Sequence, residues 1–293
     1  MGRAMAWHFI EGRWREGNPG IMGPMSHGAW MASTVFDGAR VIDGYAPDLA
    51  HHCQRLVESA HTMELTPPVD AGTMLDLVRE GYRHINPAQP LYVKPMVWAE
   101  SGFVAPDPDS AKFCLTLAEI PLPPAEGMRV RLSSFRRPTP ETAPTEAKAA
   151  CLYPNSGRAL REAKRHGYDN AVMCDVMGNV AELATANIWI VADGEVATPA
   201  PNGCFLNGIT KQRVGTLLAG DGYTVRERRI TWAEVQAADE VFTTGNLGKV
   251  LPIIGVGGRE GDGERELAIG PVCQRARDLY WEWMRDTSYL DKN

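Results

Sequence analysis

The sequence predicts an α+β protein built from two lobes. Its 293 residues are 44% hydrophobic, which is enough for two modest cores. Helical periodicity alternates along the chain with short runs rich in β-branched and aromatic residues. Residues 120–127 (IPLPPAEG) contain three prolines and a glycine, which neither continue a strand nor build a helix. We therefore expect an N-terminal α/β lobe at 1–119, a linker at 120–127 and a C-terminal lobe at 128–293.

The N-terminal lobe is expected to combine a mixed sheet with helices on one side. Its first helix is indicated by Leu49, Cys53 and Leu56, which recur at helical spacing after Pro47-Asp48. The expected elements are short strands within 7–45, helices at about 47–62 and 71–82, and strands at 91–99 and 112–119.

The C-terminal lobe is expected to be mixed as well. Gly167 closes its first helix, because glycine readily adopts the left-handed conformation that ends helices. A turn is indicated at Met177-Gly-Asn179, between two apolar runs. The expected elements are helices at 156–166, 210–218 and 270–285 and strands at 170–175 and 180–191.

Charge and composition restrict the partners. The net charge is −6 with scattered lysines and arginines, so no basic face indicates nucleic acid or an anionic membrane. The N-terminal segment carries charges early and lacks a long apolar core, which is unlike a signal peptide or a membrane span. The expectation is small-molecule chemistry in the cytoplasm.

The cysteines favour neither a metal site nor disulfides. They are widely spaced, with no CxxC pair and no histidine at ligand spacing. We expect reduced, mostly buried thiols and no metal. The six are Cys53, Cys114, Cys151, Cys174, Cys204 and Cys273.

Lys148 lies among small apolar residues, in the segment from Ala143 to Tyr153. A lysine pressed against an apolar wall loses solvation, so its neutral amine is available to condense with an aldehyde. The alternative is a solvated lysine on a loop.

Tyr153 and Glu182 add groups suited to an aromatic cofactor. Tyr153 can donate a hydrogen bond to a phenolic oxygen, or serve as a core or lobe-interface aromatic. Glu182 is a carboxylate inside an apolar strand and needs a partner. A protonated pyridine nitrogen would be one, and an arginine is the alternative.

An anion site is indicated further on. The helix start at Gly208-Ile209-Thr210 points free backbone N–H groups at whatever precedes it, although a threonine there can also be a simple N-cap. The small polar loop at 243–248 could complete the site. Arg55 could reach the same anion, or be a solvated charge on its helix. The order of these groups suits pyridoxal 5'-phosphate.

Together these residues resemble the class IV aminotransferases, the fold-type IV family of pyridoxal-phosphate enzymes that includes branched-chain aminotransferases. The resemblance runs from about Trp14 to Ile254, and the spacing between Lys148 and Glu182 also matches. Its further motifs are Val35-Phe36-Asp-Gly38, His52-Cys-Gln-Arg-Leu56, Tyr92-Val-Lys-Pro95, Arg165-His-Gly-Tyr168, Asn179-Val-Ala-Glu182, Leu206-Asn-Gly-Ile-Thr210 and Ala238-Asp-Glu-Val-Phe242.

The resemblance implies a two-lobed fold with the cofactor between the lobes, a ping-pong transfer of an amino group to a 2-oxo acid, and a homodimer. It implies Lys148 as the catalytic lysine that binds the cofactor aldehyde and moves protons. Glu182 would then lie at the pyridine nitrogen, Tyr153 at the phenolic oxygen and Leu206 on the ring face. The implied phosphate residues are Arg55, Gly208, Ile209, Thr210, Thr244, Gly245 and Asn246, the last standing where many members have a threonine.

The substrate residues depart from the branched-chain pattern. Branched-chain enzymes have a tyrosine at the position of Met31, an arginine at Lys94 and a further tyrosine from a loop that here has none. Phe36 and Tyr92 do match, so an apolar side-chain pocket is retained. The substrate residues implied are Met31, Phe36, Tyr92, Lys94 and Leu247.

The function most like this pattern is a branched-chain aminotransferase, in which Lys94 suffices for the substrate carboxylate. The alternative is an (R)-selective amine:pyruvate transaminase, whose pocket accepts an amine without a carboxylate. A D-amino-acid transaminase is less favoured because no extra arginine is present, and an aminodeoxychorismate lyase would release p-aminobenzoate. A catalytically silent binding protein would have lost cofactor residues that are all retained here.

Overall fold

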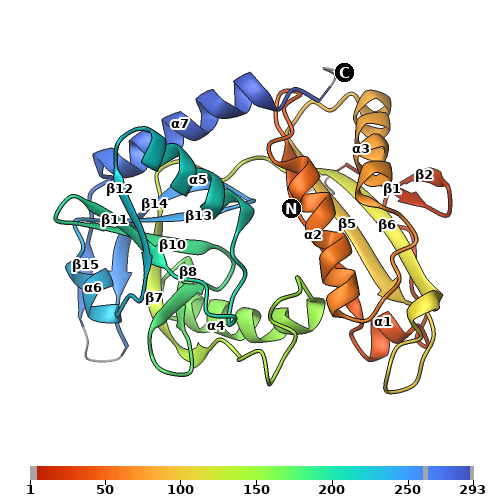
Figure 1. Cartoon of the computed structure of the whole chain (residues 1–293), viewed down its shortest axis with the longest axis horizontal. Helices are drawn as coiled ribbons and strands as arrows, with labels where there is room; N and C mark the ends of the chain where they lie inside the picture. The colour runs from red at the N-terminus through yellow and green to blue at the C-terminus, as the bar shows by residue number, and fades with distance from the viewer. Residues whose placement is uncertain (1–4, 260–262, 291–293) are drawn as a thin grey trace. The chain divides into compact units, whose positions relative to one another are not determined.

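The computed structural model describes residues 5–259 and 263–290, which form two compact units. Unit one comprises the described residues of Met1–Leu122, Glu146–Leu152 and Met284–Asn293, and unit two comprises those of Pro123–Thr145 and Tyr153–Trp283. Each unit combines a sheet with helices, which confirms the α+β class (Figure 1).

Unit one is built on a six-stranded sheet with the order β2-β1-β6-β5-β3, in which β4 also pairs with β5. Its strand pairs are antiparallel, whereas a mixed sheet was predicted. Its elements are β1 (Ala6–Ile10), β2 (Arg13–Glu16), α1 (His27–Trp30), β3 (Thr34–Phe36), β4 (Ala39–Val41), α2 (Leu49–Thr62), α3 (Ala71–Ile85), β5 (Leu91–Ala99), η1 (Pro108–Ser110), β6 (Ala111–Glu119) and η2 (Ala150–Leu152).

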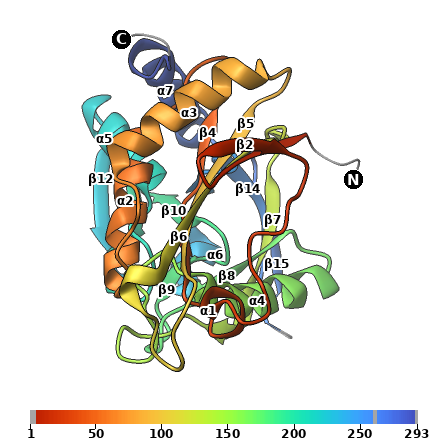
Figure 2. The same ribbon diagram turned by 90° about the vertical axis from the view of Figure 1, so that its right-hand side faces the viewer.

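Helices α2 and α3 cover one face of this sheet (Figure 2). Gly81 of α3 lies so close to Leu117 that an added Cβ would come within 2.5 Å of its side chain. Leu117 pairs with Val93 of β5, so Val93 faces the helices too. Because successive side chains of a strand point to opposite faces, Tyr92 and Lys94 share the other face.

Unit two is built on a nine-stranded mixed sheet with the order β12-β11-β10-β13-β14-β7-β8-β9, in which β15 also pairs with β14. Its elements are β7 (Met128–Arg136), α4 (Tyr153–Arg165), β8 (Asn170–Cys174), β9 (Val180–Leu183), β10 (Asn187–Ala192), β11 (Glu195–Pro199), α5 (Ile209–Gly220), β12 (Thr224–Arg228), α6 (Trp232–Ala237), β13 (Glu240–Gly245), β14 (Lys249–Gly257), β15 (Glu264–Glu266) and α7 (Pro271–Thr287), whose end from Met284 belongs to unit one.

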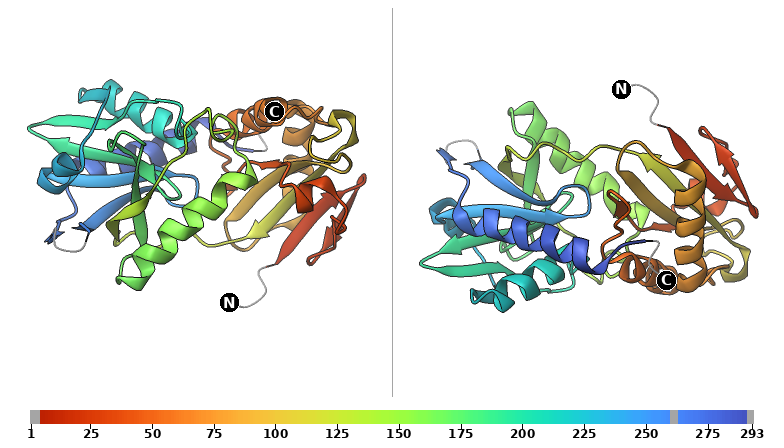
Figure 3. Two further views of the ribbon diagram at one scale, coloured as in Figure 1. Left: turned by 90° about the horizontal axis from the view of Figure 1, so that it is seen from below. Right: turned by 90° about the horizontal axis from the view of Figure 1, so that it is seen from above.

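Alternation along β10 places two cores on the faces of this sheet. Ile188 and Ile190 belong to a cluster that includes Val235 of α6. Trp189 belongs to another, with Val214 of α5 and Tyr280 of α7. Figure 3 shows α7 lying over the strands of this sheet. The strand bearing Trp189 is therefore buried on both faces.

Several predicted boundaries need correction. The run predicted as one strand at 180–191 is broken into β9 and β10, because Leu183 N–H bonds to Ala186 O (2.8 Å) in a tight turn. Helix α4 begins at Tyr153 rather than at 156, because Pro154 fits the first turn of a helix. Residues 120–127, between β6 and β7, contain no helix or strand.

Lys148 does not belong to the unit predicted for it. The prediction assigned all of 128–293 to the C-terminal lobe, but Glu146–Leu152 clusters with unit one. The chain segment after β7 therefore returns to unit one before α4 begins.

None of the helices within 5–259 and 263–290 combines the length and the apolar composition that crossing a bilayer requires.

Candidate functional site

Lys148 is held in unit one by backbone bonds to two elements. Its N–H donates to Ser59 Oγ on α2 (3.0 Å), and its carbonyl accepts from the N–H of Phe36 at the end of β3 (3.1 Å). Its half-buried side chain places Nζ 5.3 Å from the centroid of the Phe36 ring. The lysine amine is thus positioned beside an apolar ring and is not a fully solvated loop charge.

Arg55 forms a buried ion pair that was not predicted. Its Nε and Nη2 donate to Asp37 Oδ2 and Oδ1 at 2.7 and 2.9 Å, and His52 Nδ1 lies 2.7 Å from Oδ1. Burial alone raises the pKa of Asp37, but the charges and hydrogen bonds of Arg55 and His52 outweigh it and hold that pKa well below its usual range. A signal was present, because His52 and Arg55 lie three residues apart on one helix face.

The predicted substrate residues of unit one come from its sheet and from the end of α1. Tyr92 and Lys94 lie together on β5, and Phe36 pairs with Met96 of the same strand. Met31 instead caps the end of α1 and is 41% exposed. Phe36, Tyr92 and Lys94 therefore share one face of the sheet.

Arg40 was missed by the sequence reasoning. It stands opposite Tyr92 in the β4–β5 pairing, with its guanidinium carbon 5.6 Å from the centre of that ring. Nη1 and Nη2 donate to the carbonyls of Ile120 (2.6 Å) and Pro121 (3.4 Å). Burial lowers the pKa of Arg40 to about 10, against the attraction of Tyr92. These two hydrogen bonds of Arg40 connect the segment after β6 to the face of the sheet that carries Tyr92.

In unit two, Glu182 pairs with an arginine. Arg137 Nε lies 3.2 Å from Glu182 Oε1, and both side chains are largely buried. Arg137 also donates to the Cys204 carbonyl (3.1 Å) and to Ser156 Oγ (3.2 Å). The arginine alternative for Glu182 is thus present, but a carboxylate accepts several hydrogen bonds and can serve a second partner. Nothing local in the sequence pointed to Arg137.

The start of α5 and the end of β13 meet at Asn187, and we call residues 208–210 and 244–246 the α5–β13 corner. Gly208 is the N-cap of α5, and Thr210 is buried in its first turn. Asn187 Nδ2 donates to Leu206 O (3.1 Å), while its backbone pairs with Thr244. A Cβ on Gly208 would collide with Oδ1 of Asn187. The corner is therefore packed too closely for a side chain at position 208.

Half of the loop predicted at 243–248 is strand. Residues 243–245 end β13, and Thr244 Oγ1 accepts from Trp189 Nε1 (2.9 Å) in the core. Only Asn246, Leu247 and Gly248 form a turn, in which Leu247 is 54% exposed. Small polar residues predicted a loop, but their pairing with β10 and β14 keeps them extended.

Substituting Gly208 with alanine is expected to destabilise the chain by about 1–3 kcal/mol, because Asn187 must rotate and lose its bond to Leu206. The backbone at Gly208 is compatible with alanine, so the contact alone carries the effect. Gly157→Ala, on α4 with nothing within 4 Å of the added carbon, is the control and should be neutral or stabilising. Urea unfolding of both variants tests this, and equal midpoints would contradict it.

Tyr153, the residue predicted for the phenolic oxygen, is the first residue of α4 and is 37% exposed.

All six cysteines are free and only Cys151 among them is exposed, which confirms mostly buried thiols. Burial raises the pKa of both Cys53 and Cys273 to about 12, each helped by a nearby carboxylate.

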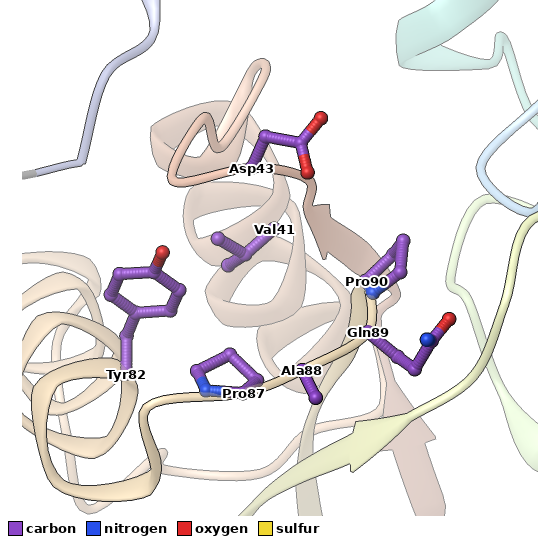
Figure 4. Close-up of a pocket in the computed structure, with 7 residues that line it drawn as sticks. All are labelled: Val41, Asp43, Tyr82, Pro87, Ala88, Gln89 and Pro90. Atoms are coloured by element: carbon purple, nitrogen blue, oxygen red, sulfur yellow. The ribbon is translucent and has the colours of Figure 1, made fainter.

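Unit one also contains a pocket (Figure 4). It is small, and two prolines and a tyrosine contribute to its wall. The lining residues are Val41, Asp43, Tyr82, Pro87, Ala88, Gln89 and Pro90. None of these was predicted to bind cofactor or substrate.

Comparison with known proteins gives a consistent result. The family described as amino-transferase class IV matches residues 34–256. A branched-chain-amino-acid aminotransferase of Pseudomonas aeruginosa is 34% identical over 286 residues, covering 92% of this chain and 89% of the relative. Curated relatives and family profile therefore agree on the type of protein.

Two solved structures extend this likeness to the fold. An aminotransferase from Brucella abortus bound to the cofactor PLP superposes with a TM-score of 0.92 and 47% identity, covering 96% of this chain and 99% of that one. A branched-chain aminotransferase from Thermoproteus uzoniensis with norvaline has a TM-score of 0.87 and 30% identity, with coverage of 96% and 95%. The predicted fold type IV is confirmed, and the chain belongs to the class IV aminotransferases.

Proposed function

We propose that this chain is a pyridoxal-phosphate-dependent transaminase that moves an amino group from an amino acid or amine to a 2-oxo acid, with branched-chain L-amino acids as its donors. The observation that carries the proposal is the position of Lys148, whose backbone is bonded to Ser59 and Phe36 while its amine lies beside the Phe36 ring. A homodimer is part of this proposal, supported by the family resemblance.

Several residues of the chain have the chemistry to bind this cofactor. A phosphate needs N–H donors, which the start of α5 offers, and Arg55, whose charge is paired with Asp37, is proposed as a further phosphate residue. The corner leaves no room for a side chain at Gly208, so backbone can approach an anion closely. Glu182 offers a carboxylate to a protonated ring nitrogen, and Arg137 beside it favours the ionised carboxylate. Leu206 and Tyr153 are proposed for the ring face and the phenolic oxygen.

When bound, pyridoxal phosphate supplies the electron sink that stabilises the charge left on a deprotonated donor carbon. The proton itself is handled by the chain: we assign its removal to the Nζ of Lys148, acting as a neutral amine. The same amine returns a proton in the opposite half of the cycle. Release of the first product before the second substrate binds gives ping-pong kinetics.

Substrate choice is assigned to the face of β5 in unit one. Phe36 and Tyr92 supply an apolar wall, and Lys94 supplies a positive charge for the substrate carboxylate. Arg40 is less suited to that task, because two of its N–H groups bond to the carbonyls of Ile120 and Pro121. Lys94 is therefore the proposed carboxylate residue of the described chain.

A second candidate, an (R)-selective amine transaminase, is favoured by Met31. This side chain is exposed and has no hydrogen-bonding group for a carboxylate where branched-chain enzymes have a tyrosine. Lysine is also a point charge, without the planar fork by which arginine holds a carboxylate. Both features suit a donor that lacks a carboxylate.

A donor panel separates the two candidates. With pyruvate and 2-oxoglutarate as acceptors, kcat/KM is measured for L-leucine, D-alanine and both enantiomers of 1-phenylethylamine. We expect L-leucine to exceed (R)-1-phenylethylamine by at least about tenfold, because one charged hydrogen bond contributes at least about 1.4 kcal/mol. The opposite order would replace the branched-chain proposal with the amine one. Protein without a visible cofactor band after addition of pyridoxal phosphate would refute both.

A further inference from the structure

A buried lysine lies next to the α5–β13 corner. Lys249 is only 1% exposed and opens β14 directly after the turn at 246–248. Its φ of +62° is in the left-handed region, which residues with a Cβ rarely adopt. A long cationic side chain is thus kept at a position that suits glycine and in surroundings that suit an apolar residue. Residues retained in such unfavourable conformations cluster at functional sites.

The ammonium group of Lys249 contacts the corner at Asn246. Its Nζ donates to Oδ1 of Asn246 at 2.9 Å. Lysine can donate but not accept, so it is the oxygen of the Asn246 amide that must face it. The NH2 end of the amide is then turned away from Lys249. The bond therefore selects one of the two orientations that an asparagine side chain can adopt.

We propose that Lys249 is a positioning residue for the cofactor phosphate: it holds the Asn246 amide so that Nδ2 donates to that phosphate. This rests on the proposed function, in which the phosphate binds at the α5–β13 corner. A threonine at position 246, as in many family members, needs no such partner because its hydroxyl can rotate to donate. An asparagine does, because only one end of its amide is a donor.

The charge of Lys249 acts in the same direction. The phosphate is an anion, and the charge of a buried cation that contacts Asn246 is weakly screened by solvent. The positive end of the α5 dipole points to the same corner. Lys249 and the start of α5 thus favour the same ligand from two elements that meet at Asn187.

A purely structural role for Lys249 makes a different prediction. Its Nζ lies 5.9 Å from the centre of the Tyr280 ring on α7, so the side chain could serve only to join β14 to that helix. Losing the Lys249 side chain would then lower the stability of the chain and weaken the binding of every ligand alike. The positioning role instead affects only ligands that carry a phosphate, which is the property to test.

The test compares pyridoxal phosphate with pyridoxal, which lacks the phosphate, on the full-length chain freed of cofactor. Dissociation constants are measured by quenching of tryptophan fluorescence for wild type, Lys249→Met, Asn246→Ala and the double variant. Lys164→Met, which removes an exposed lysine of α4, is the charge control. Circular dichroism establishes that each variant is folded.

We expect Lys249→Met to raise the dissociation constant of pyridoxal phosphate by about tenfold, which corresponds to one charge-assisted hydrogen bond. The dissociation constant of pyridoxal should stay within about twofold of the wild-type value. Asn246→Ala should raise the dissociation constant of pyridoxal phosphate by the same factor. The double variant should raise it no further, because both substitutions remove the same interaction. Unchanged phosphate affinity, an equal loss for pyridoxal, or additive losses would overturn the inference. If Lys249→Met fails to fold, Asn246→Ala with the two ligands decides. Wild type that binds neither ligand would refute the proposed function instead.

Discussion

Lys148→Ala is expected to abolish transamination and leave the fold intact. The substitution removes the only amine assigned to bind the cofactor and to move the proton, so kcat should fall by at least about 10³-fold. The backbone bonds of residue 148 to Ser59 and Phe36 do not involve its side chain and remain available to alanine. The unfolding midpoint should therefore stay close to that of wild type.

The measurement is kcat with the preferred donor, alongside borohydride reduction of the loaded protein and mass spectrometry of its peptides. Wild type should carry the cofactor on the peptide that contains Lys148, and the variant should carry none. Lys164→Ala, which removes an exposed lysine of α4, is the control and should behave as wild type. A Lys148→Ala variant within tenfold of wild-type turnover would refute the assigned role.

The elements that could be predicted from the sequence are those with a local signal. Helix α2 was expected at about 47–62 and spans Leu49–Thr62, because its apolar residues repeat every turn. Strand β5 was expected at 91–99, where it lies, because an apolar residue alternates with a half-buried one. In both, the packing partner only strengthens a pattern that the segment already carries.

Elements set by distant pairing could not be predicted in this way. Residues 180–191 are mostly apolar and contain no glycine or proline, so no strong signal marked the turn between β9 and β10. Thr243 and Thr244 have loop-like composition but are paired on both sides, with β10 and with β14. Propensity is a weak guide where neighbouring strands supply the hydrogen bonds.

The candidate site shows the same division. Lys148, Glu182 and the start of α5 were identified by residue type and order. Their partners were not, because Arg137 and Asp37 are ordinary surface-type residues until the fold buries them beside an opposite charge. The assignment of Lys148 to unit one likewise depends on Ser59, far away in the sequence. Residue order thus indicates chemistry, whereas the charges that tune it are set by tertiary packing.

Asp37→Asn is expected to lower the free energy of unfolding at pH 7 by about 3 kcal/mol, the range for breaking a buried ion pair by removing one partner. Asp37 is fully buried, and its two carboxylate oxygens accept hydrogen bonds from Arg55 and His52. An asparagine has the same shape but offers one acceptor and no charge, so the Arg55 guanidinium loses its counter-charge. The affinity for pyridoxal phosphate should fall as well, because Arg55 then loses the charged acceptor of its Nε and Nη2 groups.

The control is Asp76→Asn on α3, which breaks an ion pair with Arg79 whose aspartate side chain is 77% exposed. That exposed pair should contribute less than about 1 kcal/mol. Both variants are compared with wild type by urea unfolding, with equal slopes required for the comparison. A loss for Asp37→Asn no larger than that of the control would contradict the buried-pair interpretation.

The pH dependence gives an independent check of the same ion pair. Because the pKa of Asp37 is lower in the folded chain than its value of about 3.9 in an unfolded one, its stabilisation is fully present above that unfolded value. It is lost as the pH falls through the folded pKa, where the carboxyl takes up a proton. The difference between wild type and Asp37→Asn should therefore be present at pH 7 and shrink as the pH falls below about 4. A difference that instead grew on acidification would require Asp37 to be protonated in the folded chain, and the carboxylate charge of Asp37 would then not be available to orient Arg55.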